Sequence, residues 1–271
     1  MIMALKKTLA LVGGGNMGTA LVRGLLESNT AQPDQIRVAE LDEGRRKALE
    51  TLGVATVPRP EELPPAHVLV IAVKPADVPA ATRAAAHCLE REGLCITLAA
   101  GVKIATVAQQ LPPNQPIVRA MPNTPALVAR GATALAAGPT ARPEHLETAR
   151  AIFAAVGVVA VVEEKLMDAV TGLSGSGPAY VFQFIEALAD AGVAQGIDRA
   201  TSLLLAAHTV AGAAELLITG GEHPAVLTDR VASPGGTTIA GLQVLERGGF
   251  KGLVMDAVAA ATRRGRELGD G

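Results

Sequence analysis

The chain has 271 residues and a formal net charge of −2, with 24 basic and 26 acidic side chains interspersed along it. A chain of this length can bury a sizeable core in one large domain or in two modest ones. The near-neutral charge and the 2% aromatic content argue against a nucleic-acid partner, which would need a basic surface or stacking side chains.

The cysteines and the N-terminus bear on the cellular setting. Only Cys88 and Cys95 occur, with no histidine at metal-ligand spacing, so we expect two buried thiols and neither a disulfide scaffold nor a metal site. The apolar run at the N-terminus is interrupted by Lys6 and Lys7 and ends at glycines, which makes it too short to span a bilayer. The sequence therefore predicts a cytoplasmic protein with no membrane partner.

Residues 1–163 alternate short apolar runs with helical patterns. Several runs, such as 68-VLVIAV-73, are apolar throughout, which is typical of a parallel sheet covered on both faces. The alternation predicts an α/β domain with a doubly wound, mostly parallel sheet. The predicted strands are Thr8–Val12, Ile36–Glu40, His67–Val73, Leu94–Leu98, Pro116–Arg119, Thr133–Ala136 and Val158–Val162. The predicted helices are Asn16–Ser28, Asp42–Leu52, Asp77–Arg91, Ile104–Leu111 and Pro143–Val156.

Residues 164–271 have a different pattern, without any β-rich run, and predict an all-α domain. One helix is expected over residues 178–196. A second is expected over 198–221, opening on an Asp cap and closing on two glycines. It is apolar nearly all round, which requires burial on every side. A small helical domain cannot provide that cover alone, so we expect a homodimer, either by itself or as the unit of a larger assembly of dimers.

A G-x-G-x-x-G pattern is formed by Gly13, Gly15 and Gly18 between a predicted strand and a predicted helix. Gly13 permits a tight turn, Gly15 lets the backbone approach a pyrophosphate, and Gly18 allows the helix to pack close to the strand. The helix start adds free N–H groups and the positive end of its dipole. We therefore predict a dinucleotide-binding loop, with a purely structural glycine turn as the alternative.

The second predicted strand ends at Glu40. An acid at this place accepts hydrogen bonds from the adenosine 2′-OH and repels a 2′-phosphate, which favours NADH over NADPH. Arg45 and Arg46 follow and could reach a phosphate, although a solvated helix face explains them more simply. The predicted cofactor is NADH or NADPH, with a modest preference for NADH.

Two further loops, 72-AVKP-75 and 98-LAAG-101, follow strands whose carboxyl ends lie at the cofactor edge of such a sheet. Lys74 is the ionisable side chain in these two loops. Contact with the cofactor and plain exposure to solvent are equally good interpretations of it.

The stretch 233-SPGGTT-238 precedes a helical pattern that extends to about Glu246. Ser233 or Thr237 could simply cap that helix, which is the common use of these residues. Alternatively, the N–H groups at the helix start could bind an anion, since the glycines allow a close approach. The spacing alone favours the cap.

Six motifs occur in the order and spacing of one known family: GGGNMG at 13–18, AVKP at 72–75, RAMPNTPA at 119–126, SGSGPAYVF at 174–182, GEHP at 221–224 and SPGGTT at 233–238. Over essentially its whole length the chain resembles pyrroline-5-carboxylate reductase. The resemblance implies an N-terminal Rossmann domain over 1–163 and a C-terminal α-helical dimerisation domain over 164–271. It also implies reduction of L-1-pyrroline-5-carboxylate to L-proline with NAD(P)H, the last step of proline biosynthesis.

The resemblance further implies roles for individual residues, and it favours a substrate site over a helix cap at 233–238. Thr238 would be the catalytic residue, with its hydroxyl at the ring nitrogen. Members that prefer NADPH generally have small hydroxyl residues where this chain has Glu40, which puts NADPH preference in doubt and not the reaction. The implied substrate contacts are Glu222, Ser233, Gly235, Gly236, Thr237 and Thr238. The implied cofactor contacts are Val12, Gly13, Gly14, Gly15, Asn16, Met17, Gly18, Glu40, Ala72, Val73, Lys74, Pro75, Leu98, Ala99 and Ala100.

Two alternatives to the imine reductase remain at this point. Another Rossmann–helical oxidoreductase, of the β-hydroxyacid dehydrogenase kind, resembles the chain at the glycine loop but relies on a lysine of its helical domain, and residues 166–247 contain no lysine. A non-catalytic dinucleotide-sensing protein would keep the glycine loop and would not need SPGGTT.

Overall fold

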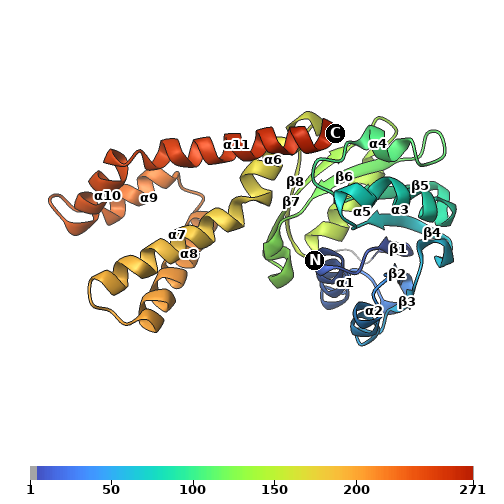
Figure 1. Cartoon of the computed structure of the whole chain (residues 1–271), viewed down its shortest axis with the longest axis horizontal. Coiled ribbons are helices and arrows are strands. Elements are labelled where there is room, and N and C mark those ends of the chain that lie inside the picture. The colour runs from blue at the N-terminus through green and yellow to red at the C-terminus, as the bar shows by residue number, and fades with distance from the viewer. Residues whose placement is uncertain (1–4, 271) are drawn as a thin grey trace. The chain divides into compact units, whose positions relative to one another are not determined.

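The computed structural model describes residues 5–270 (Figure 1) and divides them into two compact units. Unit 1 comprises residues 5–176 together with 259–270, and unit 2 comprises Gly177–Val258. The domain boundary expected between residues 163 and 164 rests on the change of sequence pattern and stays a prediction.

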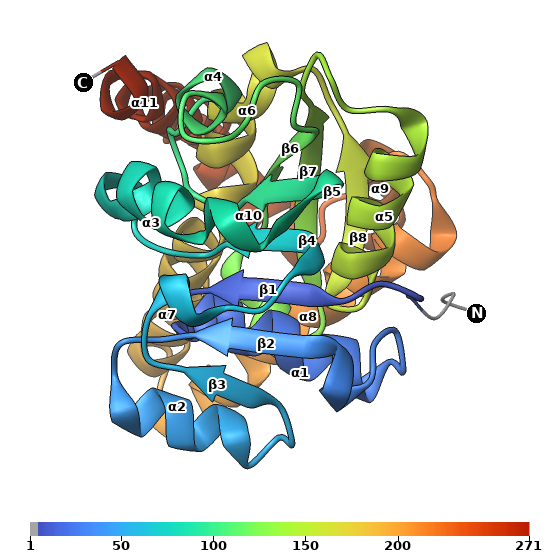
Figure 2. The same cartoon turned by 90° about the vertical axis from the view of Figure 1, so that its right-hand side faces the viewer.

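Unit 1 is built on one sheet of eight strands: β1 (Leu9–Val12), β2 (Ile36–Ala39), β3 (Ala55–Val57), β4 (Ala66–Ile71), β5 (Leu89–Thr97), β6 (Ile117–Met121), β7 (Gly131–Ala137) and β8 (Gly157–Val161). Their order is β3-β2-β1-β4-β5-β6-β7-β8, and Figure 2 shows β1, β2 and β3 side by side. Neighbouring strands are parallel except β6 and β7. The first six strands follow the Rossmann order, so the predicted doubly wound, mostly parallel sheet is confirmed.

The helices of unit 1 that precede unit 2 are α1 (Asn16–Glu27), α2 (Glu43–Glu50), α3 (Val78–Ala85), α4 (Ile104–Ala108), α5 (Pro143–Ala154) and α6 (Met167–Val170), and a π-helical turn at Thr171–Gly175 follows α6. Two hydrophobic cores lie on opposite faces of the sheet. Leu9 and Leu11 of β1 belong to the first and Ala10 and Val12 to the second, because strand side chains point alternately to opposite faces. Helices α1, α2 and α5 complete the first core, and α3 and α4 the second.

Unit 2 is helical and contains α7 (Gly177–Ala194), α8 (Arg199–Gly220), α9 (Pro224–Val231), α10 (Thr237–Arg247) and the start of α11 (Phe250–Asp270). Figure 1 shows α7 and α8 packed side by side. The rings of Phe184 and Phe250, with centroids 6.0 Å apart, join α7 to α11. The remainder of α11 belongs to unit 1.

The predicted ends of α8 are confirmed. Asp198 caps the helix by accepting a hydrogen bond from the backbone N–H of Thr201, and Gly221 ends it in the left-handed conformation with a φ of +64°. Both signals are local, which is why the sequence alone carries them.

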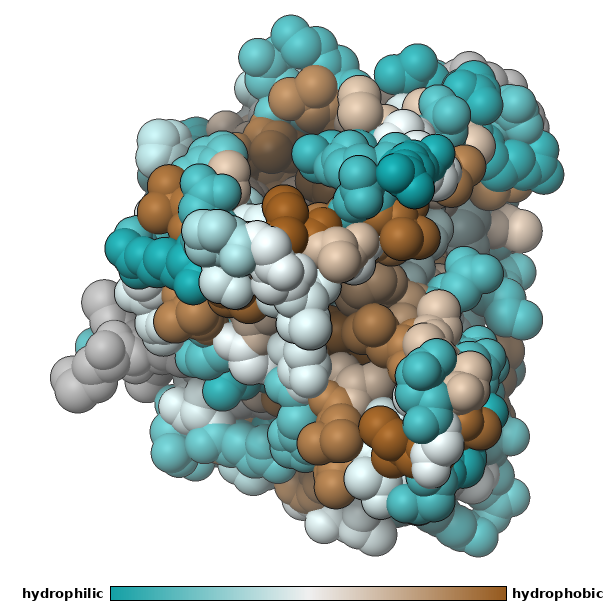
Figure 3. Space-filling model, turned by 90° about the vertical axis from the view of Figure 1, so that its left-hand side faces the viewer, coloured by the Kyte–Doolittle hydropathy of each residue, from teal (hydrophilic) through white to brown (hydrophobic). Residues whose placement is uncertain are grey.

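Much of the apolar surface of unit 2 is exposed within one chain. Of the 22 residues of α8 only Ser202 and Ala206 are buried, whereas Leu203, Leu204 and Leu205 are at least half exposed. Figure 3, which faces the side where Figure 1 draws α8 to α10, shows hydrophobic side chains among the polar ones. Among the described residues, α8 is also the one helix long and apolar enough to cross a membrane by length and composition. A helix that packs against a second chain meets the same criterion.

Some elements differ from the prediction. The helix expected up to Arg91 ends at Ala85, and β5 already begins at Leu89. The segment Leu89–Gly93 is charged and looks helical, but Leu89 pairs with Ala66 of β4, so the sheet decides its conformation. The short strand β3 and the helices α9 and α11 were not predicted.

Candidate active site

A cleft of about 690 Å³ opens in unit 1 where β1 and β4, neighbours in the sheet, lead to opposite sides of it. The backbone oxygen of Val12 accepts a hydrogen bond of 2.8 Å from Ala72 N, which ties the two strand ends together. This is the topological switch point, where open α/β sheets bind their ligands. The cleft is lined by Val12, Gly13, Gly15, Asn16, Ala39, Glu40, Leu41, Arg45, Pro58, Pro60, Glu61, Ala72, Val73, Lys74, Asp77, Ala80, Ala81 and Ala84.

The glycine loop connects β1 to α1 by backbone contacts that exclude side chains. Gly13 has a φ of +104°, and a Cβ there would lie 2.6 Å from the backbone oxygen of Ala72. A Cβ on Gly18 would lie 2.1 Å from the backbone oxygen of Gly13. Only glycine fits at either place. The turn is therefore tight, and the first turn of α1 lies directly on the loop.

The start of α1 faces the cleft with its backbone donors free of side-chain caps. Gly15 is the N-cap residue and forms no side-chain cap hydrogen bond. The first N–H groups of a helix have no intrahelical acceptor, and the helix dipole places a partial positive charge there. A Cβ on Gly15 would have its nearest neighbour, Arg45 Nη1, 3.9 Å away, so the space above the loop is open. This arrangement can bind a phosphate group.

Glu40 closes the cleft at the end of β2, and its carboxylate holds the loop around it. Its Oε2 accepts a hydrogen bond of 2.6 Å from Gly14 N, and its Oε1 accepts one of 2.9 Å from Asp42 N. Glu40 is buried in this arrangement, with 9% of its surface exposed. Each carboxylate oxygen can accept a further bond, so a ribose hydroxyl can still be bound.

The two arginines after β2 have different surroundings. Arg46 donates from Nη1 to the backbone oxygens of Glu40 and Leu41, at 2.9 and 2.7 Å. Arg45 lines the cleft near Gly15, although a solvated helix face was the simpler expectation for both. Arg45 is exposed to solvent and also lines the cleft, so it is both part of a solvated helix face and within reach of a ligand there.

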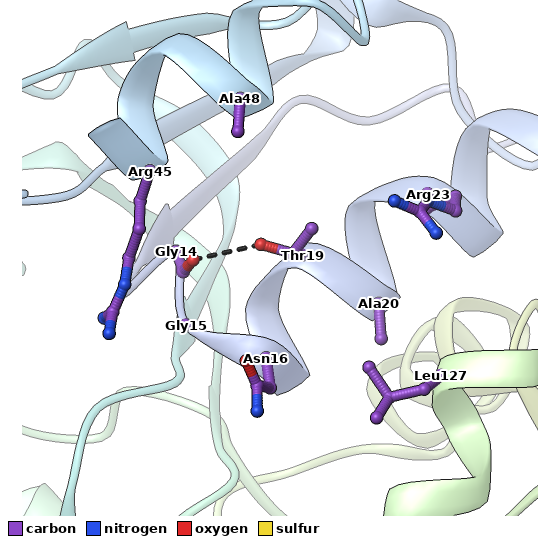
Figure 4. A pocket seen from close by; sticks show the side chains of 9 residues that line it. All are labelled: Gly14, Gly15, Asn16, Thr19, Ala20, Arg23, Arg45, Ala48 and Leu127. Carbon is purple, nitrogen blue, oxygen red and sulfur yellow. Dashed lines mark hydrogen bonds between the residues drawn. The ribbon is translucent and has the colours of Figure 1, made fainter. Parts of the chain in front are cut away.

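A smaller cavity of about 180 Å³ (Figure 4) also lies at the glycine loop and shares Gly15, Asn16 and Arg45 with the lining of the cleft. Arg45 lines it from α2, and Arg23 lines it from α1. Thr19 donates to the backbone oxygen of Gly14 at 3.0 Å, which ties α1 to the loop at this place. Among the described residues neither arginine forms an ion pair, so the cavity is bordered by positive charge.

The residues that the resemblance implies for the cofactor all lie in unit 1, but not all of them line the cleft. Those that do not are Gly14, Met17, Gly18, Pro75, Leu98, Ala99 and Ala100. Leu98 and Ala99 are buried, with 9% and 4% of their surfaces exposed, in the turn after β5. Sequence reasoning missed the wall made by α3, where Ala80, Ala81 and Ala84 leave room for a ligand. The small residues of 79-PAATRAAA-86 were the available signal.

The residues implied for the substrate all lie in unit 2. Glu222 forms a bidentate ion pair with Arg230 of α9, at 2.6 and 2.5 Å. His223 caps α9 by accepting from Ala225 N at 3.2 Å. The segment between α9 and α10 then carries 233-SPGGTT-238.

The start of α10 lacks the side-chain cap that the spacing favoured. Gly236 is the N-cap residue, and no side chain caps the helix, so neither Ser233 nor Thr237 has that role. A Cβ on Gly236 would lie 2.2 Å from Ser233 Oγ, so the Ser233 side chain would have to rotate to admit one. Among the described residues, the hydroxyl of the half-buried Thr238 has no hydrogen-bond partner. The first N–H groups of this 11-residue helix are thus available to an anion.

Two known families match separate parts of the chain, one in the helical part and one in the part that contains the glycine loop. Residues 164–268 match the family described as pyrroline-5-carboxylate reductase dimerisation. Residues 8–101 match the family described as NADP oxidoreductase, coenzyme F420-dependent.

Full-length relatives carry the same name. The chain is 47% identical over 263 residues to a pyrroline-5-carboxylate reductase of Synechocystis, covering 96% of this chain and 98% of the relative. A structure of the enzyme from Coxiella burnetii is similar with a TM-score of 0.92 and 35% identity, over 97% of this chain and 99% of that one. The Plasmodium falciparum enzyme with NADP bound has a TM-score of 0.87 and 30% identity, over 98% and 100%. The chain therefore belongs to the pyrroline-5-carboxylate reductase family.

Proposed function

We propose that the chain reduces L-1-pyrroline-5-carboxylate to L-proline with NAD(P)H, the last step of proline biosynthesis. The observation that carries this proposal is a cleft at the Rossmann switch point in a chain that is 47% identical, over 96% of its length, to a pyrroline-5-carboxylate reductase. The nicotinamide cofactor supplies the hydride for the imine carbon. The protein binds and orients the reactants, and its positioning and electrostatics provide the rate enhancement.

The residues of unit 1 fit a dinucleotide. The volume of about 690 Å³ is in the range of ligand pockets. The uncapped start of α1 and the Cβ-free turn at Gly13 suit a pyrophosphate, which would receive N–H donors at close range. Glu40 lies where a ribose of the adenosine half would be bound. Lys74, in the loop after β4, also lines the cleft and is exposed.

For the choice between cofactors, NADH is preferred because of Glu40. A 2′-phosphate would meet the negative charge of this carboxylate, whereas a 2′-OH could donate to it. Arg45 and Arg46 lie nearby and reduce the repulsion, so the preference is modest. Glu40 also holds Gly14 N and Asp42 N, which makes it part of the loop's structure as well as a cofactor contact.

Steady-state kinetics with both cofactors test this preference on two substitutions. Glu40→Gln removes the charge and keeps one of the two oxygens that accept from Gly14 N and Asp42 N, so KM for NADPH should fall relative to KM for NADH. Glu40→Ser also improves NADPH use relative to NADH, but it leaves Gly14 N without its acceptor and should weaken both cofactors. An unchanged NADPH-to-NADH ratio of kcat/KM in Glu40→Gln would remove Glu40 from cofactor selection.

The substrate binds at the start of α10 in this proposal. Its carboxylate accepts hydrogen bonds from the backbone N–H groups in the first turn of α10, beginning at Thr237, and the absence of a side-chain cap supports this role. Gly235, with a φ of +67° and nothing near its missing Cβ, lets the ring approach the backbone. The hydroxyl of Thr238 can donate to or accept from the ring nitrogen, which suits a group that changes protonation. Glu222 is held by Arg230, which lies three residues before Ser233 in the chain.

Kinetics of Thr238→Ala test this assignment, with Thr228→Ala on α9 as the matched control. The hydroxyl of Thr228 is bonded to the backbone oxygen of Pro224 and should be dispensable for turnover. Loss of one charge-stabilising donor costs on the order of 100-fold in kcat. Thr238→Ser should retain most of the activity. Unchanged kcat and substrate KM in Thr238→Ala would remove Thr238 from the site.

The function as a whole is tested by oxidation of NADH and NADPH in the presence of pyrroline-5-carboxylate, with proline identified as the product. A β-hydroxyacid dehydrogenase would turn over hydroxy acids instead, and a dinucleotide sensor would bind without turnover. The dimerisation domain and the exposed apolar surface of unit 2 support a homodimer. A larger assembly of dimers, a cytoplasmic location and the lack of a membrane partner stay predictions.

A further inference from the structure

The turn that leads from β5 to α4 has a backbone that only a narrow set of residues can adopt. It runs from Leu98 to Ile104, and Gly101 at its apex is buried with a φ of +78°. This is the left-handed region, which favours glycine. The family resemblance implies that Leu98, Ala99 and Ala100, the first three residues of the turn, contact the cofactor, although they do not line the cleft.

The C-terminal part of α11 lies against the apex of this turn, backbone to backbone. Figures 1 and 2 both show the end of α11 next to α4. A Cβ on Gly101 would lie 3.4 Å from Gly265 O and 3.4 Å from Gly269 N. A Cβ on Gly269 would lie 2.4 Å from Gly101 O, which is closer than folded proteins permit. The contact therefore exists only while residue 269 is glycine.

The far end of the same turn is held by a cluster of charges. Ile104 N, at the start of α4, donates to Glu164 Oε1 at 2.6 Å. Arg119 of β6 places Nη1 3.7 Å from Glu164 Oε1 and Nη2 3.3 Å from Asp168 Oδ1. Arg119 is only 3% exposed, and a buried guanidinium is tolerable only with such partners. The Glu164 carboxylate, which accepts the hydrogen bond from Ile104 N, is thus itself held in place by Arg119.

We propose that Gly269 and Glu164 are positioning residues that fix the 98–104 turn for the nicotinamide half of the cofactor. This inference rests on the proposed function. Glu164 precedes unit 2 in the chain, and Gly269 follows it on α11. Both residues belong to unit 1, so two segments far apart in the sequence hold the same turn.

The main test compares Gly269→Ala with Gly265→Ala, the same change one helical turn earlier. At Gly265 a Cβ would have its nearest neighbour, Asp168 Cβ, 3.7 Å away, an ordinary contact. The dissociation constants of NADH and of ADP are measured by calorimetry. ADP reports the adenosine end and the glycine loop, whereas NADH also reports the nicotinamide end.

Gly269→Ala should raise the dissociation constant of NADH and lower kcat/KM by about tenfold or more, because small displacements of positioning groups are costly. Its affinity for ADP should not change, and Gly265→Ala should match the unsubstituted chain in every measurement. Equal NADH affinities in the two variants would overturn the inference, and so would a parallel loss of ADP affinity.

A second pair of variants keeps the inference testable should Gly269→Ala fail to fold. Glu164→Ala removes the acceptor of Ile104 N and should weaken NADH without weakening ADP. Glu164→Gln retains an oxygen acceptor and should restore most of the NADH affinity. No difference between these two variants would contradict the role of Glu164. Failure of the unsubstituted chain to turn over pyrroline-5-carboxylate would instead refute the proposed function and leave the NADH and ADP results standing.

Discussion

The two units differ in how far their own residues cover their apolar side chains. In unit 1, five of the six residues of β4 are buried, and Ile152 and Phe153 of α5 are 0% and 1% exposed. In unit 2, α8 has only two buried residues among 22, and Leu204 is 58% exposed. Both sequences are strongly apolar, so hydrophobicity alone does not distinguish a self-contained core from a surface that needs a partner.

The difference follows from how each apolar segment is surrounded. A central strand of unit 1 receives helices on both faces, and alternate residues enter two separate cores. Helix α8 packs on α7 along one side, and its remaining sides have no cover within unit 2. Burying a Leu side chain stabilises by about 1.5–3 kcal/mol. A second copy that covers several such leucines therefore supplies a large part of the stability of unit 2.

The largest expected effect comes from a charge placed on α8. Leu204→Arg would put a guanidinium into the surface that a second copy covers, and an unpaired buried charge weakens association by about 3 kcal/mol or more. Size-exclusion chromatography with light scattering over a dilution series should then show monomers. Val158→Arg on β8, a 71% exposed position of unit 1, is the matched control and should leave the dimer intact. Dimers of equal stability in both variants would show that the apolar surface of α8 is not covered by a second copy.

A cavity in the core of unit 1 should have a different signature. Leu69 of β4 is fully buried, so Leu69→Ala should lower the free energy of unfolding by about 2–5 kcal/mol. Denaturant unfolding at two protein concentrations measures the loss relative to the unsubstituted chain. Because the core lies within one chain, the loss should be the same at both concentrations. A loss that grows on dilution would mean that unit 1 also depends on the partner.

A smaller, pH-dependent effect is expected at the start of α8. Hydrogen bonds from the Thr201 side chain and backbone lower the pKa of Asp198 below its usual value. A carboxylate with a lowered pKa contributes its stabilisation above the pKa of the unfolded chain and loses it as the pH falls through the folded value. Asp198→Ala should therefore lower the thermal midpoint at neutral pH, and the gap to the unsubstituted chain should close in acid. A gap that does not change with pH would exclude the charged cap as its cause.

The smallest effect concerns the two thiols of unit 1. Burial raises the pKa of Cys88 to about 11 and that of Cys95 to about 12. The thiolate is the reactive form, so iodoacetamide at pH 8 should label neither cysteine in the folded protein and both after unfolding in denaturant. Mass spectrometry of the labelled chain measures this. Rapid labelling of the folded protein would show that the core of unit 1 opens readily.

The parts of the structure that the sequence predicted depend on local signals. The glycine loop, the continuous apolar strands and the caps of α8 each involve residues close together in the chain. They were sufficient for the Rossmann sheet and for the cofactor edge of it. The order of the motifs then identified the family, since the glycine loop alone is common to many oxidoreductases.

The parts that the sequence did not predict depend on contacts between distant residues. The segment Leu89–Gly93 reads as a helix and becomes a strand only because β4 lies beside it. The hydrogen bond from Gly14 N to Glu40 and the approach of Gly269 to Gly101 join residues far apart in the chain. The placement of Arg45 at the cleft depends on how α2 packs, so the sequence could offer it only as one of two interpretations.

Sedimentation velocity of the purified chain at micromolar concentration tests the central contrast between the units most directly. The exposed leucines of α8 and the match to a dimerisation domain predict a dimer, or a larger assembly of dimers, with no appreciable monomer. A stable, folded monomer at that concentration would contradict the account, because it would show that unit 2 does not need a second copy.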